Sequence, residues 1–275
     1  MKIKYLGTAA AEGVPAFFCK CEVCQNAILK KGKEIRTRSQ ALINDDLLID
    51  FGPDSYFHFV FQNVPLADIE HILITHSHSD HLQVDELSFI KKGYAAIVKN
   101  EKVKVYGNGS SYNMVKNMIE SNDCDDRMEA IEVIPYHTYK VGNYMVSPIS
   151  ANHDVKSSPV NYVIDDGQTI ILYAHDTGVF FDESIDFLKK LGKKLDLISL
   201  DCTAGLLTLW KDHHLSYDCF LEEINRLKEQ NIIDNNTKII ANHFSHNGKA
   251  SYEKMQEVAN KDNIIVSYDG LEIEI

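Results

Sequence analysis

Four side chains that can bind a metal ion fall within the six residues 76–81, and they are His76, His78, Asp80 and His81. Neutral imidazole and carboxylate groups together suit zinc, manganese or iron, and four of them exceed what one mononuclear site takes from a single loop. Three of the chain's 12 histidines stand in this segment, which favours a metal site over a chance surface turn. The apolar run 71–75 precedes it and predicts a buried strand that positions the loop.

This segment needs partners, because two metal ions about 3.5–4 Å apart take roughly seven protein ligands, commonly with one shared carboxylate. Three candidates, His153, Asp176 and His243, follow apolar segments far along the chain. Asp176 is the candidate for the shared carboxylate. Its neighbour His175 should point to the opposite face of the strand, because side chains alternate, and it is assigned a structural role. The sequence therefore predicts a dinuclear site whose ligands come from several strand ends.

A second metal site is predicted from the cysteines, three of which stand within six residues at Cys19, Cys21 and Cys24. This density fits a tetrahedral structural zinc that lacks its fourth ligand, and disulfides between such close cysteines are sterically unfavourable. His246 is the candidate for the fourth ligand, because it stands three residues after His243. One short loop would then supply a ligand to each site.

The elements that must position these residues are short apolar strands and amphipathic helices, with no long linker and no low-complexity tract. The expected strands cover residues 2–7, 40–44, 47–50, 71–75, 103–106, 131–135, 144–149, 160–165, 169–173, 195–200, 237–241 and 263–266. The expected helices cover residues 54–62, 85–93, 110–121, 183–191, 216–230 and 251–260. This mixture predicts an α/β protein of the mixed α+β kind, with two sheets flanked by helices and a single domain over residues 1–275.

Composition restricts the partners and the compartment. The formal net charge is −12, the sequence pI is near 5.4, and no Lys/Arg stripe with interleaved aromatics is present, so no large nucleic acid is expected as a partner. There is no run of 18 apolar residues to cross a membrane, and the first residues read as a strand and not as a signal peptide. We expect a cytoplasmic protein without a membrane partner. The sequence leaves the oligomeric state open, with a homodimer among the options.

The ordered ligand candidates carry a family resemblance over essentially the whole chain. With both Asp80 and His81 present, they resemble the dinuclear phosphodiesterase and thioesterase branches of the metallo-β-lactamase superfamily. This resemblance implies a four-layer αββα sandwich and two divalent metal ions, zinc or manganese, in the active site. The thiol-rich loop with the late pair His243 and His246 is similar to the PhnP family, phosphodiesterases of the carbon–phosphorus lyase pathway. That similarity implies one structural zinc and a small, cyclic phosphate diester as substrate, such as phosphoribosyl 1,2-cyclic phosphate or a 2′,3′-cyclic nucleotide.

The resemblance also implies a mechanism, in which a hydroxide that bridges the two metal ions attacks phosphorus and His214 protonates the leaving oxygen. The neighbouring His213 is the competing candidate for this general acid. Asp80 is expected to act in catalysis as a ligand. Asp50 and Asp201 stand at strand ends and should hold ligand histidines in the correct tautomer.

Three alternative functions stay open. A glyoxalase-II-like thioesterase would use the same ligands to attack a thioester carbonyl. A nuclease of the tRNA 3′-processing type would need a basic surface, which the acidic chain does not offer. A non-hydrolytic metal or redox module is the third, although oxygen-reducing relatives carry a carboxylate at the position of His78 and an attached flavin domain. Residues 7–15 and 212–216 also depart from the usual PhnP pattern, so the resemblance leaves the substrate unspecified.

Overall fold

The computed structural model describes residues 1–96 and 101–275, and its strands form two seven-stranded sheets. The strands are β1 (Lys2–Gly7), β2 (Gln40–Ile43), β3 (Leu47–Ile49), β4 (His71–Leu73), β5 (Val103–Gly107), β6 (Met128–Glu132), β7 (Tyr139–Val141), β8 (Tyr144–Ser150), β9 (Val160–Asp165), β10 (Ile170–Ala174), β11 (Leu197–Asp201), β12 (Lys238–Asn242), β13 (Ile265–Val266) and β14 (Leu271–Glu274). The α-helices are α1 (Glu22–Lys30), α2 (Ser55–Phe61), α3 (Val84–Leu87), α4 (Gly109–Ser121), α5 (Asp182–Lys190), α6 (Tyr217–Glu229) and α7 (Tyr252–Ala259). One sheet has the order β14-β1-β2-β3-β4-β5-β6 and the other β13-β12-β11-β10-β9-β8-β7.

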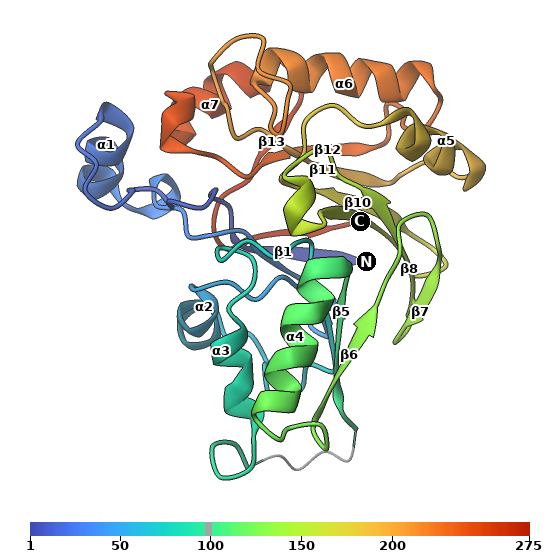
Figure 1. The fold of residues 1–275 in the computed structure, drawn as a ribbon. Helices are drawn as coiled ribbons and strands as arrows, with labels where there is room; N and C mark the ends of the chain where they lie inside the picture. The colour runs from blue at the N-terminus through green and yellow to red at the C-terminus, as the bar shows by residue number, and fades with distance from the viewer. Residues whose placement is uncertain (97–100) are drawn as a thin grey trace.

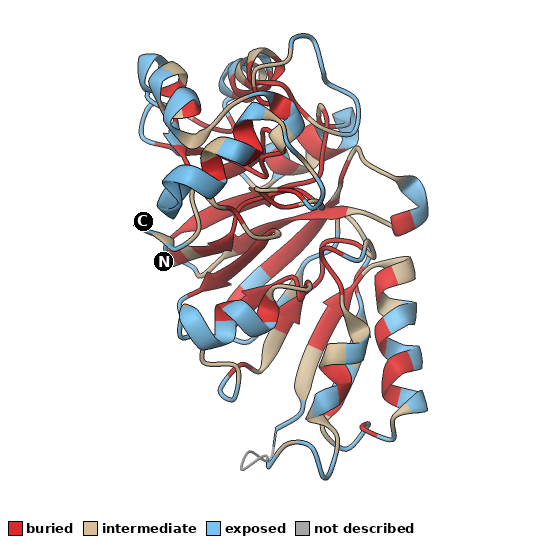
Figure 2. Ribbon diagram, turned by 90° about the vertical axis from the view of Figure 1, so that its left-hand side faces the viewer, coloured by how far each residue is buried: buried red, intermediate tan, exposed pale blue. Residues whose placement is uncertain are grey.

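The two sheets pack face to face and helices cover both outer faces, which gives four layers (Figure 1). A core cluster that includes Tyr5, Tyr162 and Tyr173 fills the space between the sheets. A second cluster packs α3 and α4 against the first sheet, and a third packs α5, α6 and α7 against the second. Figure 2 shows the buried residues concentrated in the sheets and on the inward faces of the helices. The predicted αββα sandwich of the mixed α/β class is confirmed.

Each sheet has a parallel half, whose strands end at the same edge. In the first sheet β3, β4, β5 and β6 run parallel, and in the second β10, β11, β12 and β13 do. The carboxyl ends of parallel strands are where loops can bring side chains from different parts of a chain together. The loops after β4, β10 and β12 contain most of the candidate ligands of the active site.

Two predicted elements differ from those observed. The helix expected over 85–93 is only the short α3 followed by a 3-10 turn, Ser88–Ile90. Ser88 Oγ donates a hydrogen bond to the carbonyl oxygen of Asp85 (2.6 Å), which gives the backbone an alternative to a longer α-helix. The strand expected at 131–135 is shifted to β6, because its parallel pairing with β5 starts at Met128.

Among the described α-helices and strands, three are not predicted from the sequence, namely α1, β7 and β14. The edge strand β14 pairs antiparallel with β1, at the other end of the chain, so its place depends on a distant partner. Among the described residues, no helix combines the length and the apolar character that a membrane span requires.

Candidate metal centre

Three histidine nitrogens converge where the loop after β4 meets the loop after β8. His78 Nδ1 lies 3.0 Å from His76 Nε2 and 3.2 Å from His153 Nε2. Burial, together with the neighbouring His81, holds the pKa of His76 well below its usual value, so its ring is neutral and has a lone pair to offer. The structure thus brings the predicted ligands His76, His78 and His153 together at the spacing of a metal-binding cluster.

The other four predicted ligands, Asp80, His81, Asp176 and His243, form a second, buried group. Asp176 Oδ2 lies 2.6 Å from His81 Nε2 and 3.0 Å from His243 Nε2. Asp80 Oδ2 lies 3.2 Å from His81 Nε2. Three of these buried atoms nevertheless lack a partner in hydrogen-bond geometry among the described residues, namely Asp176 Oδ2, His81 Nε2 and His243 Nε2. Buried polar atoms are nearly always satisfied, so three unsatisfied atoms this close together fit a bound cation.

Asp176 lies between the two groups. Its Oδ2 is 3.8 Å from His76 Nε2, and its Oδ1 is 3.8 Å from His153 Nε2. This is the position that a carboxylate shared by two metal ions would take. His175 belongs to neither group, because strand alternation turns it away, and its Nε2 lies 2.7 Å from Ser199 Oγ.

The chain turns sharply at the strand ends that carry side chains of the site. Asp50 follows β3, Asp176 lies just after β10 and His243 follows β12, and their φ angles are 66°, 52° and 64°. A positive φ is uncommon for residues other than glycine, and such conformations concentrate at functional sites. Gly52 is needed for a different reason. A Cβ at this position would lie 2.0 Å from the carbonyl oxygen of Asp80, so only glycine lets the chain pass the ligand loop.

Each ligand histidine of the two groups has a partner for its second ring nitrogen. The pairs are His81 Nδ1 with Asp50 Oδ2 (2.7 Å), His243 Nδ1 with Thr203 Oγ1 (2.7 Å), His76 Nδ1 with Thr75 Oγ1 (3.1 Å), His78 Nε2 with Asp154 Oδ2 (3.2 Å) and His153 Nδ1 with the carbonyl oxygen of His213 (3.3 Å). Such partners hold the tautomer and the ring orientation that a metal ligand needs. Sequence reasoning identifies Asp50 but misses Thr75, Asp154 and Thr203. Thr75 and Asp154 each stand beside a ligand histidine in the sequence, which is the only signal that could have identified them. Thr203 has no such signal.

Asp201 positions the candidate general acid. Its Oδ2 lies 3.1 Å from His214 Nδ1, and its Oδ1 accepts from the backbone N–H groups of Leu215 (2.9 Å) and Thr203 (3.0 Å). Burial opposes the charged form of His214, but the Asp201 carboxylate outweighs it and raises the pKa of His214. A raised pKa favours the protonated ring, which is the form that a general acid needs. The side chain of His213 is exposed and packs edge-on against His153, whereas His214 is held by Asp201, so the geometry favours His214.

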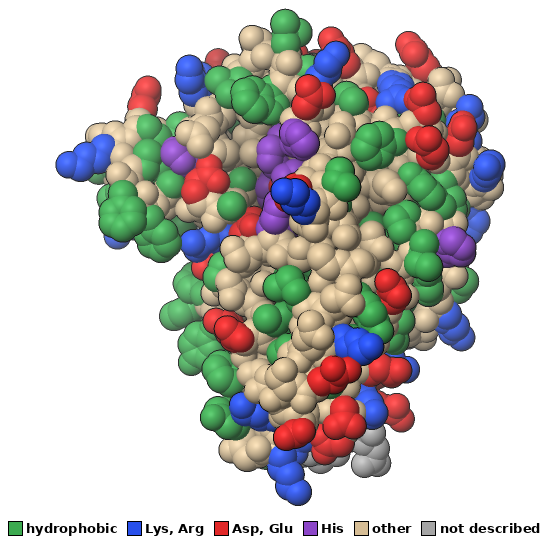
Figure 3. Space-filling model, viewed as in Figure 1, with side chains coloured by type: hydrophobic (Ala, Val, Ile, Leu, Met, Phe, Trp, Pro, Cys, Tyr) green, Lys and Arg blue, Asp and Glu red, His purple; other side chains and the backbone are tan. Residues whose placement is uncertain are grey.

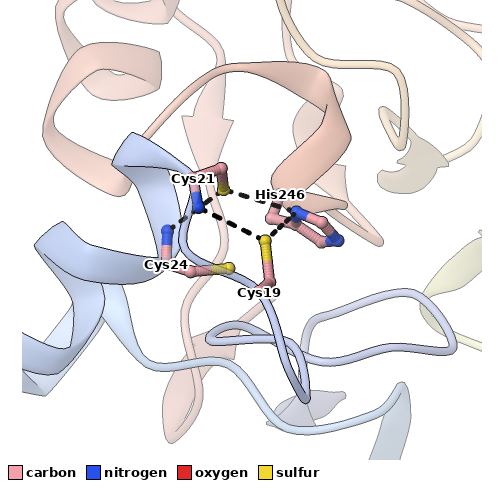
Figure 4. Close-up of side chains that lie close together, drawn as sticks. All are labelled: Cys19, Cys21, Cys24 and His246. Atoms are coloured by element: carbon pink, nitrogen blue, oxygen red, sulfur yellow. Dashed lines mark hydrogen bonds between the residues drawn. The ribbon is translucent and has the colours of Figure 1, made fainter.

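The thiol-rich loop and the loop after β12 form the second predicted site (Figure 4). Cys19 Sγ and Cys21 Sγ each lie 3.5 Å from His246 Nδ1, and with Cys24 Sγ the four atoms are within 4.8 Å of one another. Cys21 caps α1 by accepting a hydrogen bond from the N–H of Cys24. Burial raises the pKa of the Cys24 thiol to about 12, so a bound cation would be needed to keep this sulfur ionised. Three sulfurs and one imidazole suit a tetrahedral zinc ion.

The two active-site groups open into a cavity of about 550 Å³. Figure 3 shows histidine side chains gathered at the surface in the middle of one face of the molecule. A cavity of this volume is within the roughly 300–1,000 Å³ of small-molecule sites. A larger hollow of about 680 Å³ is lined by residues of β4, α3 and β6. None of its described lining residues is a candidate ligand, so the smaller cavity is the candidate site.

Comparisons with known proteins agree with this geometry. The sequence matches the family described as beta-lactamase superfamily domain over residues 46–233. No curated protein matches the sequence. A crystal structure of a diphosphatase from the PhnP family is similar over 100% of this chain and 97% of that chain, with a TM-score of 0.76 and 21% identity. Zinc-bound PqqB from Methylobacterium extorquens is similar over 100% of both chains, with a TM-score of 0.73 and 17% identity. The short form of human tRNase Z is similar over 100% of this chain and 99% of that chain, with a TM-score of 0.67 and 14% identity.

At these identities the likeness to solved structures concerns the fold. The family match covers more than half of the chain, and it includes the ligand candidates from His76 to Asp176. The fold, the family match and the two groups of buried histidines and aspartates point to the same class of protein. The chain belongs to the beta-lactamase superfamily domain family and is a metal-dependent hydrolase of that superfamily.

Proposed function

We propose that the protein is a dinuclear-metal phosphodiesterase that hydrolyses a small, cyclic phosphate diester, such as phosphoribosyl 1,2-cyclic phosphate or a 2′,3′-cyclic nucleotide. The supporting observation is the proton donor beside the shared carboxylate, where His214 Nδ1 lies 3.6 Å from Asp176 Oδ1. A sugar oxygen leaves as a strong base and needs a proton, whereas the thiolate that leaves a thioester is a much weaker base. This placement therefore favours a diester over the thioester of a glyoxalase-II-like enzyme.

We assign one divalent ion to His76, His78 and His153 and the other to Asp80, His81 and His243, with Asp176 shared. Imidazole and carboxylate ligands suit zinc or manganese. When bound, such a pair supplies Lewis-acid activation of water and neutralises charge on the diester. The thiolate site supplies four protein ligands, as a structural zinc requires, and leaves no open position for substrate.

The chain's own groups perform the remaining steps. Asp201 holds His214 through Nδ1, so the proton available to the leaving oxygen is the one on Nε2. The second ring nitrogens of the ligand histidines are also engaged, which keeps those rings from turning as substrate binds. As partners we propose a small diester substrate and no large nucleic acid, given the net charge of −12.

The test compares three substrates on protein reconstituted with zinc or with manganese. These are a cyclic phosphodiester, a glutathione thioester and a precursor tRNA. We expect hydrolysis of the cyclic diester, with much lower rates on the other two. Preferential cleavage of the thioester or of the tRNA would replace the proposal by the corresponding alternative. Absence of hydrolysis with all three substrates would favour a non-hydrolytic module.

A further inference from the structure

One part of the active-site cavity is apolar and aromatic. Besides the candidate ligands, Leu207, Trp210, Ala10 and Ala11 line the cavity. Trp210 is 52% exposed. An aromatic face left in water beside a reactive centre costs free energy that a ligand ring can recover by stacking on it.

The backbone that carries Trp210 is fixed in place. The N–H of Trp210 donates to Ser216 Oγ (3.0 Å), and the N–H of Ser216 donates to the carbonyl oxygen of Trp210 (2.8 Å). The N–H of Leu209 donates to Asp218 Oδ2 (2.9 Å). Ser216 is the N-terminal cap of α6 and stands two residues after His214. The backbone of Trp210 is therefore held at a set position relative to the proton donor.

The charges of the cavity disfavour a second phosphate on the substrate. Among the described residues that line it there is no lysine or arginine, although Figure 3 shows a basic side chain next to the gathered histidines. The lining does include Glu12, whose Oε1 accepts from Asn247 Nδ2 (3.3 Å) and from Ser245 Oγ. Away from the metal ligands, a terminal phosphate dianion would meet the Glu12 carboxylate and no lysine or arginine among the described lining residues, which is unfavourable.

We infer that Trp210 determines specificity, and that the site selects phosphodiesters that carry an aromatic ring and no second phosphate. A nucleoside 2′,3′-cyclic phosphate has this chemistry, whereas a base-free ribosyl cyclic phosphate with a 5-phosphate does not. The inference rests on the proposed function. In the reaction, water adds its hydroxyl to phosphorus and gives up its other proton to solvent, and the bond from phosphorus to one ribose oxygen breaks. That oxygen takes the proton held by His214, which regains a proton from solvent. The product is a nucleoside monophosphate.

Because Trp210 is the only tryptophan of the chain, its fluorescence reports binding directly. We would titrate the metal-loaded protein with the slowly hydrolysed phosphorothioate analogue of adenosine 2′,3′-cyclic phosphate. We expect saturable quenching, and no quenching by the corresponding ribosyl compound that lacks the base. Absence of quenching by the adenosine analogue would overturn the inference.

Kinetics supply the second readout. In Trp210→Ala, KM for adenosine 2′,3′-cyclic phosphate should rise about tenfold, as expected for one lost stacking contact, with kcat little changed. Trp210→Phe should restore most of the affinity. Leu209→Ala is the matched control, because this exposed neighbour is in the same loop but does not line the cavity, and its KM should be unchanged.

A 5′-phosphate on the adenosine substrate should raise KM. An unchanged KM in Trp210→Ala, or equal kcat/KM for the base-free 5-phosphoribosyl cyclic phosphate, would overturn the inference and leave the proposed function standing. Failure of the wild-type protein to hydrolyse any diester would instead overturn the proposed function, and this inference with it.

Discussion

Replacing Asp201 by Asn tests the assignment of the proton donor, because it removes the negative charge beside His214 and keeps the shape of the side chain. The amide oxygen can still accept from the backbone N–H groups of Leu215 and Thr203. The amide nitrogen would face His214 Nδ1, where a carboxylate oxygen now lies 3.1 Å away. Asp201 Oδ2 also lies 3.4 Å from His243 Nδ1 and accepts from Thr203 Oγ1 (2.9 Å), so the metal content of the variant must be measured to show that His243 still holds its ion.

The size of the effect follows from the lost contact. A hydrogen bond to a charged group contributes about 1.5–3 kcal/mol, which corresponds to roughly one to two pKa units. The carboxylate raises the pKa of His214, so its loss lowers that pKa while burial, which also lowers it, remains. A general acid works only while it is protonated. The basic limb of the pH–rate profile should therefore move to lower pH by about one to two units, with activity above it reduced about 10–100-fold.

The assay compares two substrates over a range of pH. Hydrolysis of a 2′,3′-cyclic nucleotide needs a proton on the departing ribose oxygen and should show the full shift. Hydrolysis of bis(p-nitrophenyl) phosphate should be much less affected, because p-nitrophenolate leaves without a proton. Metal content is measured in parallel. An unchanged profile with the cyclic nucleotide, in a variant that keeps its metal ions, would refute the role of His214 and Asp201.

Two further variants test other parts of the structure. Cys21→Ser should lose one zinc ion per chain, which elemental analysis measures. It should also lose about 2 kcal/mol or more of stability, which is roughly 4–8 °C in Tm for a chain of this size and is measured by calorimetry. An unchanged zinc content and an unchanged Tm would disprove the thiolate site. His58 is buried, with Nδ1 2.6 Å from Gln40 Oε1, and burial lowers its pKa to about 4. The unfolded chain protonates His58 near pH 6.5, whereas the folded chain does so only near pH 4. Between pH 7 and pH 4 the free energy of unfolding of the wild type should therefore fall by about 3 kcal/mol more than that of His58→Asn. Equal losses of stability in urea unfolding would contradict this burial effect.

Much of the site could be predicted because its ligands have residue types and spacings that little else explains. The dense segment from His76 to His81 and the thiols at Cys19, Cys21 and Cys24 are local patterns, and the structure places each in a cluster. His153, Asp176 and His243 have no local pattern of that kind. They could be proposed only because each follows an apolar strand and the first segment required partners.

The residues that sequence reasoning missed depend on loops that meet only in the folded chain. Thr203 reaches His243 because β11 and β12 end side by side, and a threonine near a strand end has no distinguishing feature in the sequence. Trp210 stands far from the first metal segment along the chain, yet both line one cavity. Among the elements, α1 was missed because it is short and packs only Val23, Cys24 and Ala27 inward, so its apolar period is weak.

The rate of bis(p-nitrophenyl) phosphate hydrolysis by folded Asp176→Ala tests the central claim most directly. The Asp176 carboxylate lies between the two groups of ligands, 3.8 Å from His76 Nε2 and from His153 Nε2 and 2.6 Å from His81 Nε2. If two metal ions share it during hydrolysis, the rate should fall to background while circular dichroism shows an intact fold. Full activity in the purified variant would contradict the dinuclear mechanism.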